Sequence, residues 1–362
     1  MTEENSPNVE GEMIKIMTMK KVLYTFFALV ALVFTSCSNK VDLYAGEGEY
    51  TIVYATLDAS LDTSFFKITH SFLGNANELA MNYDANNYKY DEIEVKFTGK
   101  FNDSNNTETI LLDTISKWIP YDPEATFYTG CYQTYYYTIR KLKEGEEYTV
   151  EILRKTDNVT VSATTSTINS FVYQKPPTTM PITFTDYQTS TATVEWRVRD
   201  YPFKSTASYF EVTGYFNYKE LQPGASDTVY RSIEWPLGSG TADALLNTSS
   251  NIPYYVISYA PAQLYVLLAN DKYLKENSPH RVKRWFEKFT FRVSGIGDEL
   301  YNYYLITNSS SAIQDVPNYT NVENGYGIVS ARVSKDENLV ISDLTKRKVI
   351  ELFPEYGFQE LP

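Results

Sequence analysis

The chain has 362 residues, and its 45 acidic side chains outnumber its 32 lysines and arginines, which gives a formal net charge of −13. An acidic chain without a basic cluster excludes nucleic acid as an expected partner, and it argues against electrostatic docking on anionic lipid. The chain also contains 32 tyrosines. Because strands favour aromatic side chains, this composition predicts a mainly β protein.

The first element is an apolar stretch, Val22–Phe34, which follows Lys20 and Lys21. It is shorter than the roughly 20 residues that span a bilayer, so the pattern predicts a cleaved signal peptide. The segment Phe34-Thr-Ser-Cys37 resembles a bacterial lipobox, although Phe34 stands where Leu or Val is usual. We therefore predict cleavage before Cys37 and acyl chains, palmitate among them, on this residue. The alternative is ordinary cleavage that leaves the Cys37 thiol free.

Residues 1–16 carry four glutamates and are unlike the start of a signal peptide. We therefore expect translation to begin at Met13, Met17 or Met19. The signal peptide would end at residue 36, and residues 37–49 would form a lipidated tether. Because the tether is poor in acids after Cys37, the sequence leaves open whether the protein faces the periplasm or the cell surface from the outer membrane.

Residues 50–172 are expected to form an immunoglobulin-like or fibronectin-like β-sandwich. The residues of Glu92–Thr98 alternate between polar and apolar, as in a half-buried strand. Thr107–Ile119 is predicted as one strand, with a hairpin turn later at Asp157–Asn158. The spacing Leu142-x-x-Gly145-x-x-Tyr148 resembles the tyrosine corner of such sandwiches, in which the tyrosine hydroxyl bonds to the backbone upstream.

Residues 173–181 contain Pro176-Pro177 and are predicted to be a stiff linker. Residues 182–362 are expected to form a larger β-rich domain with a few short helices. The predicted helices are 242–246, a stretch from Pro261 to Leu274, 298–305 and 343–353.

Several segments together resemble Bacteroidota lipoproteins of domain-of-unknown-function family 4249. The segments are Tyr54–Asp58, Phe65–Asn77, Asp91–Val95, Phe216–Glu220, Asp298–Tyr303 and Asn321–Ile328. The most specific piece is Asn-x-Glu-Asn-Gly-x-Gly-Ile at 321–328. The resemblance implies an outer-membrane accessory role beside a TonB-dependent transporter, and it supplies no catalytic residues.

The segment 321–327 has two interpretations. Gly325 and Gly327 permit positive φ angles or a close backbone approach, which predicts a bulged turn into an edge strand. In the functional interpretation, Glu323, Asn324, Gly325 and Gly327 form a rim that meets a partner or ligand.

The residues for common catalytic chemistry are scarce. His70 and His280 are the two histidines, and neither is near a Gly-x-Ser-x-Gly elbow or in zinc-binding spacing. We therefore predict no enzymatic activity, no metal and no cofactor. Cys131 is expected to be a small buried apolar residue without a disulfide partner.

Two segments, Asp113-Thr114-Ile115 and Asp227-Thr228-Val229, resemble the Asp-Ser/Thr-apolar sequon for O-glycosylation in Bacteroidota envelope proteins. Thr114 and Thr228 are thus candidate acceptors of a glycan.

The sequence favours a lipid-anchored, non-enzymatic accessory or adhesion protein of the cell envelope. The alternative is a glycan- or nutrient-binding lipoprotein, suggested by the tyrosines and by Trp118, Trp196, Trp235 and Trp285. Buried tryptophans would favour the first function, and exposed aromatic side chains in one cleft would favour the second. A hydrolase would need two facing carboxylates in a pocket.

Overall fold

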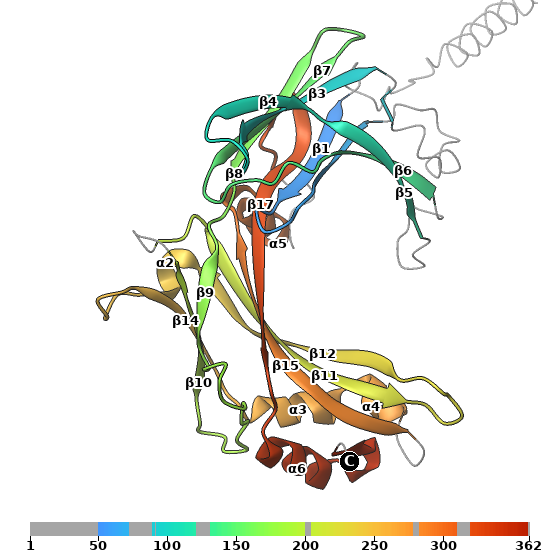
Figure 1. Ribbon diagram of the computed structural model, residues 1–362, viewed down its shortest axis with the longest axis vertical. Coiled ribbons are helices and arrows are strands. Elements are labelled where there is room, and N and C mark those ends of the chain that lie inside the picture. The colour runs from blue at the N-terminus through green and yellow to red at the C-terminus, as the bar shows by residue number, and fades with distance from the viewer. Residues whose placement is uncertain are drawn as a thin grey trace, which may run out of the picture. The chain divides into compact units, whose positions relative to one another are not determined.

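The computed structural model describes residues 50–71, 89–90, 92–120, 131–199, 204–277, 282–309 and 319–360. The predicted signal peptide, Cys37, the tether and His280 lie outside these ranges. From Glu49 onward the chain is one compact unit (Figure 1).

The described residues form a mainly β fold with a few short helices, as the sequence predicts. The strands of the first half are β1 (Thr51–Leu57), β2 (Ser64–His70), β3 (Ile93–Lys100), β4 (Thr107–Leu111), β5 (Asp113–Ile119), β6 (Cys131–Thr138), β7 (Glu147–Arg154), β8 (Thr160–Ser166) and β9 (Phe171–Lys175). The strands of the second half are β10 (Ala192–Val198), β11 (Tyr209–Leu221), β12 (Val229–Thr241), β13 (Leu246–Asn247), β14 (Tyr254–Tyr259), β15 (Lys283–Ile296), β16 (Val322–Glu323), β17 (Gly325–Leu339) and β18 (Phe358–Gln359). The helical segments are α2 (Ala242–Leu245), α3 (Gln263–Asn270), α4 (Lys272–Glu276), α5 (Asp298–Ser309), α6 (Asp343–Leu352) and the 3₁₀ turn η3 (Pro354–Tyr356).

In the described part of the chain these strands form three sheets. The largest has the order β12-β11-β15-β17-β1-β2-β6-β5, with β18 paired to β15. The other two have the orders β13-β14-β10-β9 and β16-β8-β7-β3-β4.

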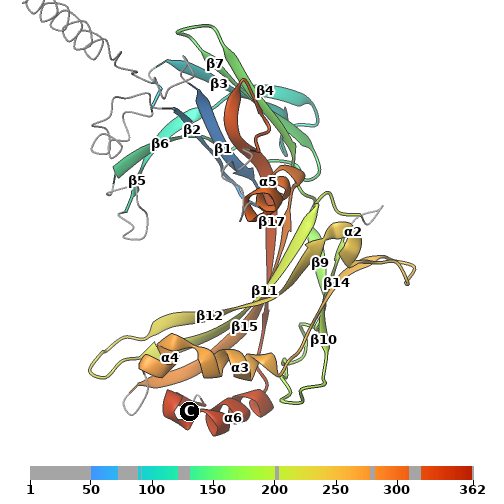
Figure 2. The same ribbon diagram turned by 180° about the vertical axis from the view of Figure 1, so that it is seen from behind.

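Strand β17 connects the two halves of the compact unit (Figure 2). Its first residues pair in parallel with β1, from Thr51↔Gly325 to Leu57↔Ala331. Its later residues pair in antiparallel fashion with β15, from Ile296↔Arg332 to Phe289↔Leu339. The predicted edge strand corresponds to the start of β17, where Gly325–Ala331 pair with β1 and the pairing with β15 begins only at Arg332, so this prediction stays open. The predicted boundary at 173–181 stays a prediction, although β9 already covers 173–175.

A shared aromatic core joins β2 of the largest sheet to β3 of the five-stranded sheet. Phe66 of β2 and Phe97 of β3 are fully buried, and their ring centroids are 5.0 Å apart. The predicted tyrosine corner is confirmed: Gly145 has a φ of 69°, and the Tyr148 hydroxyl accepts a 2.7 Å hydrogen bond from the Lys143 N–H. The same hydroxyl donates to the carbonyl oxygen of Lys100.

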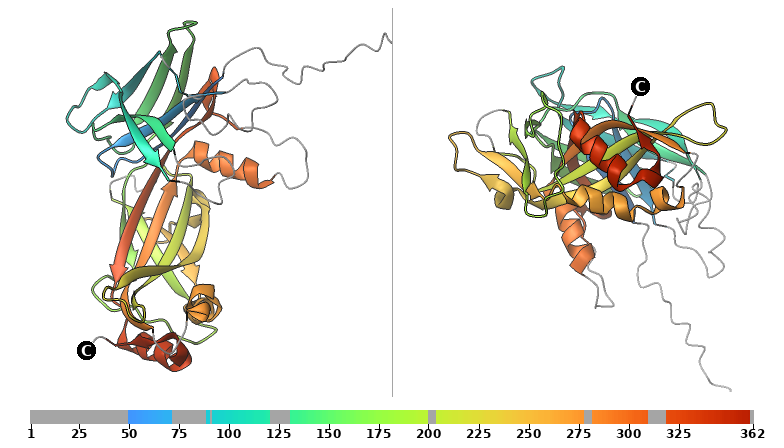
Figure 3. Two further views of the ribbon diagram at one scale, coloured as in Figure 1. Left: turned by 90° about the vertical axis from the view of Figure 1, so that its right-hand side faces the viewer. Right: turned by 90° about the horizontal axis from the view of Figure 1, so that it is seen from below.

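Aromatic side chains also build the core of the second half. Trp196 of β10 is fully buried, and its ring lies 5.2 Å from that of Phe210 on β11. Trp235 of β12 is buried near Phe184, which packs on Phe289 at 4.8 Å. Figure 3 shows α6, in red, at the end of these strands.

Most predicted helices are confirmed, but two predicted elements are interrupted. Helices α2, α5 and α6 begin at the expected residues. The stretch from Pro261 to Leu274 is not one helix, because Asp271 is extended and its side chain accepts from the Leu274 N–H at the start of α4. Likewise 107–119 is not one strand. The chain leaves β4 at Leu112, whose N–H bonds to Val95, and enters β5 in another sheet.

Candidate functional site

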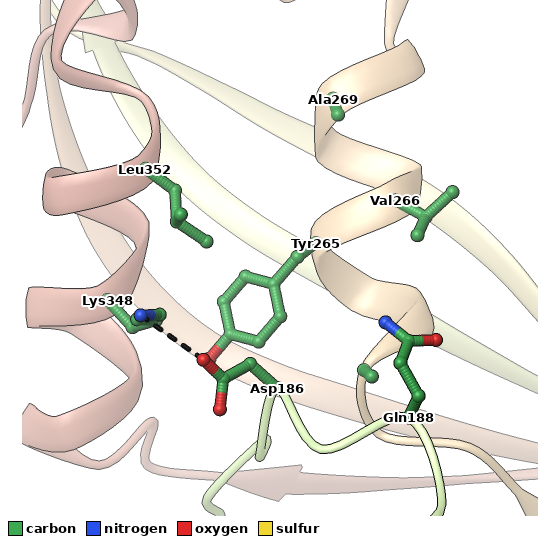
Figure 4. A pocket seen from close by; sticks show the side chains of 8 residues that line it. Asp186, Gln188, Tyr265, Val266, Ala269, Lys348 and Leu352 are labelled. Carbon is green, nitrogen blue, oxygen red and sulfur yellow. Dashed lines mark ion pairs between the residues drawn. The ribbon is translucent and has the colours of Figure 1, made fainter.

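A cavity of about 330 Å³ lies between α3 and α6 (Figure 4). The Lys348 ammonium pairs with the Asp186 carboxylate at 3.2 Å, and the Tyr265 hydroxyl donates to the carbonyl of Phe184 at 2.7 Å. These polar groups satisfy one another, and the remaining walls are largely helix side chains. We therefore interpret this cavity as a gap in helix packing.

A buried ionic network lies at the far end of β11. Glu220 and Arg284 are both fully buried, and a Glu220 carboxylate oxygen lies 2.8 Å from the Arg284 guanidinium. The other Glu220 oxygen accepts hydrogen bonds from Gln222 at 2.6 Å, Tyr273 at 2.6 Å and Arg231 at 3.0 Å. This carboxylate therefore has four donors, as a buried charge requires.

The same contacts determine the protonation of Glu220. Burial alone would raise the pKa of its carboxyl, but the hydrogen bonds from Tyr273, Arg231 and Gln222 and the charge of Arg284 outweigh burial and lower the pKa below its ordinary value. The Arg284 guanidinium also donates to the carbonyl oxygens of Tyr356 and Asn277. The network thus ties β11, β12 and β15 to α4 and to the segment before β18. A cavity of about 390 Å³ beside it is lined in part by Tyr230 and Tyr273.

The largest of these cavities, about 540 Å³, lies where β5 and β6 face β3. We call it the β5–β6 groove. Figure 2 shows β5 and β6 as a ribbon at one side of the sheet. Three cross-strand pairs follow one another along this ribbon, namely Thr114↔Tyr136, Ser116↔Thr134 and Trp118↔Tyr132. Because side chains alternate along a strand, all six lie on the same face of the ribbon.

The three pairs differ in exposure. Tyr136 is 8% exposed at the inner end, and burial raises the pKa of its hydroxyl. Trp118 and Tyr132 are 55% and 67% exposed, with ring centroids 5.1 Å apart in an edge-to-face arrangement. Exposed single aromatic residues are common, but here two large rings are paired next to the groove, on the same ribbon face as the lining residues Ser116 and Thr134.

The opposite wall of the β5–β6 groove carries charged and aromatic residues. Tyr90 is held by a 2.7 Å hydrogen bond between its hydroxyl and Thr51 Oγ1. Glu94 pairs with Lys96 at 3.2 Å. Lys89 and Lys155 also line the groove and are exposed. The arrangement combines hydroxyl, ammonium and aromatic groups, which suits a polar ligand with an apolar face.

The segment 321–327 has a clear structural role. Asn324, with a φ of 57°, lies where the chain passes from β16 in one sheet to β17 in another. Its side-chain amide donates to the carbonyl of Thr160 at 3.0 Å, and Glu323 accepts from Ser162 at 3.2 Å. A Cβ on Gly327 would overlap the backbone of β1.

The contacts of Asn324, Glu323 and Gly327 account for the passage of the chain from β16 to β17 without a ligand. Glu323 and Asn324 are nevertheless exposed. Their role as an interaction rim, together with Gly325 and Gly327, stays a prediction.

The other sequence-predicted residues are dispersed. Thr114 is exposed on β5 and lines the groove, whereas Thr228 is exposed just before β12. His70 Nδ1 lies 3.1 Å from the Ser71 carbonyl, and its ring packs on Tyr90. Cys131 begins β6, and its burial stays a prediction.

The four tryptophans do not share one exposed site. Trp196 and Trp235 are buried and Trp285 is half-buried, so Trp118 is the exposed one. Sequence reasoning missed the pairing of Trp118 with Tyr132 and the groove beside them. The available signal was the pattern Thr-x-Ser-x-Trp at 114–118 and Tyr-x-Thr-x-Tyr at 132–136.

A scan against protein-family models gave no match, and neither did a search of curated proteins. Within the described ranges, no group of three or more His, Cys, Asp or Glu residues is placed to hold a metal ion. In the same part of the chain, no helix is long and apolar enough to cross a membrane.

Proposed function

We propose that this protein is a lipoprotein of the outer membrane, anchored through acyl chains on Cys37, that acts as a non-enzymatic accessory or adhesion protein. The observation that carries this proposal is the order of Lys20-Lys21, the apolar run Val22–Phe34, two small residues and then Cys37. The segments that resemble family 4249 suggest a TonB-dependent transporter as the partner.

The described body is compatible with such a role. Strand β17 pairs with both β1 and β15, so hydrogen-bonded sheet continues through both halves of the compact unit. Trp196 and Trp235 contribute to the core. Buried tryptophans are what a structural use of these residues predicts, and they support an accessory function over one in which tryptophans bind a ligand.

The anchor is tested by growing the native host with an alkyne-labelled palmitate and isolating the protein. The unchanged chain should carry the label and fractionate with outer membranes. Cys37→Ser should lose both properties. Cys131→Ser is the matched control, because it removes the other cysteine and should leave labelling intact. Equal labelling of all three proteins would overturn the proposal.

The partner is tested by solubilising outer membranes in mild detergent and purifying the tagged chain. Recovery of a TonB-dependent transporter, identified by mass spectrometry, is the expected result. A protein that sediments alone at its monomer mass would contradict an accessory role. Protease treatment of intact cells then assigns the side of the membrane, since a surface-facing chain is cleaved and a periplasmic chain is protected.

Glycan or nutrient binding is a second candidate function, favoured by one specific observation. Trp118 and Tyr132 are large, exposed and in contact, and they lie on the face of the ribbon that lines the β5–β6 groove. Aromatic side chains supply apolar contact area together with a polar edge, which suits sugars and other amphipathic solutes. Both candidate functions are compatible with the same lipid anchor.

A further inference from the structure

We propose that the β5–β6 groove binds a linear acidic oligosaccharide, with Trp118 and Tyr132 as a stacking platform that continues the same face of the ribbon beyond the residues lining the groove. This proposal rests on the second candidate function above and names its site and ligand class. The groove has a volume of about 540 Å³, which is within the usual size range of small-molecule sites.

The platform is the first argument. A pyranose ring has an apolar face of C–H groups and a rim of hydroxyls, so it stacks on an aromatic ring and hydrogen-bonds sideways. Trp118 and Tyr132 are directly opposite each other on β5 and β6, and more than half of each side chain is exposed. Their edge-to-face contact fixes the relative orientation of the two rings before a ligand arrives.

Hydroxyl groups give the second argument. Thr114, Ser116 and Thr134 lie on the same face: Thr114 is opposite buried Tyr136, and Ser116 and Thr134 lie between that pair and the platform. Among the residues that the structure describes, none of these three hydroxyls has a side-chain hydrogen-bond partner. A hydroxyl both donates and accepts, so the three can bond the hydroxyl rim of a sugar in either sense.

Charge gives the third argument and the ligand class. Lys89 and Lys155 line the groove, and neither has an ion-pair partner in the described part of the chain. The lining glutamate, Glu94, is already paired with Lys96. The groove thus has two uncompensated positive charges on a chain of net charge −13. A carboxylate-bearing sugar would form charge-assisted hydrogen bonds with these ammonium groups.

An extended peptide is the competing occupant. Strand β5 is at the end of its sheet order, so among the described strands one edge of its backbone has no neighbour and could accept an added strand. However, strand addition uses that backbone edge and does not require paired exposed aromatic residues or a row of hydroxyls. We therefore favour the oligosaccharide, and the experiment includes the peptide as an outcome.

The test is calorimetric titration of the purified full chain with short oligomers of galacturonic acid, and with neutral cello-oligosaccharides of the same length. The protein should be made in a host without O-glycosylation, so that Thr114 is unmodified. The acidic oligomer should bind more tightly than the neutral one, and added salt should weaken its binding. Trp118→Ala and Tyr132→Ala should each weaken binding by about tenfold or more.

Tyr187→Ala is the matched control, because Tyr187 is 72% exposed and belongs neither to the groove lining nor to the β5–β6 ribbon. It should bind as the unchanged chain does, and circular dichroism should show that all variants are folded. The lysines are tested in a separate double variant, Lys89→Ala and Lys155→Ala. This variant should lose the preference for the acidic oligomer and still bind the neutral oligomer weakly.

The outcomes separate this proposal from the function on which it rests. If the unchanged chain binds an oligosaccharide but Trp118→Ala and Tyr132→Ala bind equally well, the site is wrong and glycan binding stands. If the chain binds neither oligomer, or binds an extended peptide that competes at the groove, both the site and the ligand class are overturned.

Discussion

Replacing Glu220 with Gln tests the buried ionic network most directly. Glu220→Gln keeps the size and shape of the side chain but removes its charge and turns one acceptor oxygen into a donor. The Arg284 guanidinium, fully buried and now 2.8 Å from a carboxylate oxygen, would then have no anion beside it. Gln222, Tyr273 and Arg231 would compete for a single weaker acceptor.

The magnitude follows from what Arg284 retains. Removing one partner of a buried ion pair costs about 3–5 kcal/mol, because the other charge is left uncompensated. Arg284 keeps its hydrogen bonds to the carbonyls of Tyr356 and Asn277, so we expect the lower end of this range. A loss of about 3 kcal/mol lowers the folding equilibrium constant by roughly a hundredfold.

The assay is urea unfolding followed by circular dichroism, with the free energy of unfolding taken by linear extrapolation. Glu287→Gln is the matched control, because Glu287 pairs with Lys219 at 2.7 Å on the surface, where each side chain is about one-third exposed. Such a pair contributes at most about 1 kcal/mol. Equal losses in the two variants would refute the reasoning, since burial would then make no difference.

Three further predictions follow from described contacts. The fold lowers the pKa of Glu220, so its carboxylate contributes fully to stability above the unfolded pKa of about 4.3, and this contribution is lost as the pH falls through the folded pKa. Curves of unfolding free energy against pH for the unchanged chain and for Glu220→Gln should therefore converge in acid. Tyr148→Phe should cost about 1–2 kcal/mol in urea unfolding, because the Lys143 N–H loses its acceptor. Gly327→Ala should cost more than about 3 kcal/mol or abolish soluble expression, since its φ is 113° and a Cβ would overlap the Val53 carbonyl.

The controls for the last two predictions come from the same fold. Tyr137→Phe removes a hydroxyl that has no hydrogen-bond partner in the described residues, and it should change stability little. Gly224→Ala introduces a side chain at a φ of 80° where no atom lies within 4 Å. It should cost only the backbone strain, about 1–2 kcal/mol. A Gly327→Ala protein that melts at the same temperature as Gly224→Ala would contradict the proposed overlap.

Local signals in the sequence predicted local structure well. Gly145 and Tyr148 have fixed spacing and conformational needs, and the corner forms as expected. Helices α5 and α6 begin at Asp298 and Asp343, where the sequence predicts them to start, and Ser342 caps α6. These features depend on neighbours within a few residues, which a single sequence displays directly.

Features that depend on distant residues were not predictable in this way. Nothing near Glu220 indicates that Arg284, 64 positions later, will meet it in the core. The parallel pairing of Thr51 with Gly325 is equally invisible in the sequence. The β5–β6 groove also depends on tertiary structure, because the break at Leu112 that moves the chain from one sheet to the other follows from its bond to Val95.

The position of β17 also constrains the order in which the protein can fold as it is synthesised. Strand β1 is the first described strand in the chain, but its partner Gly325–Ala331 follows more than two hundred residues later. Until that segment is synthesised, β1 lacks its β17 neighbour, and closing so long a loop is slow. The early strands would therefore need protection from aggregation, and a chain that stalls before Gly325 would be a substrate for proteolysis rather than a folded half.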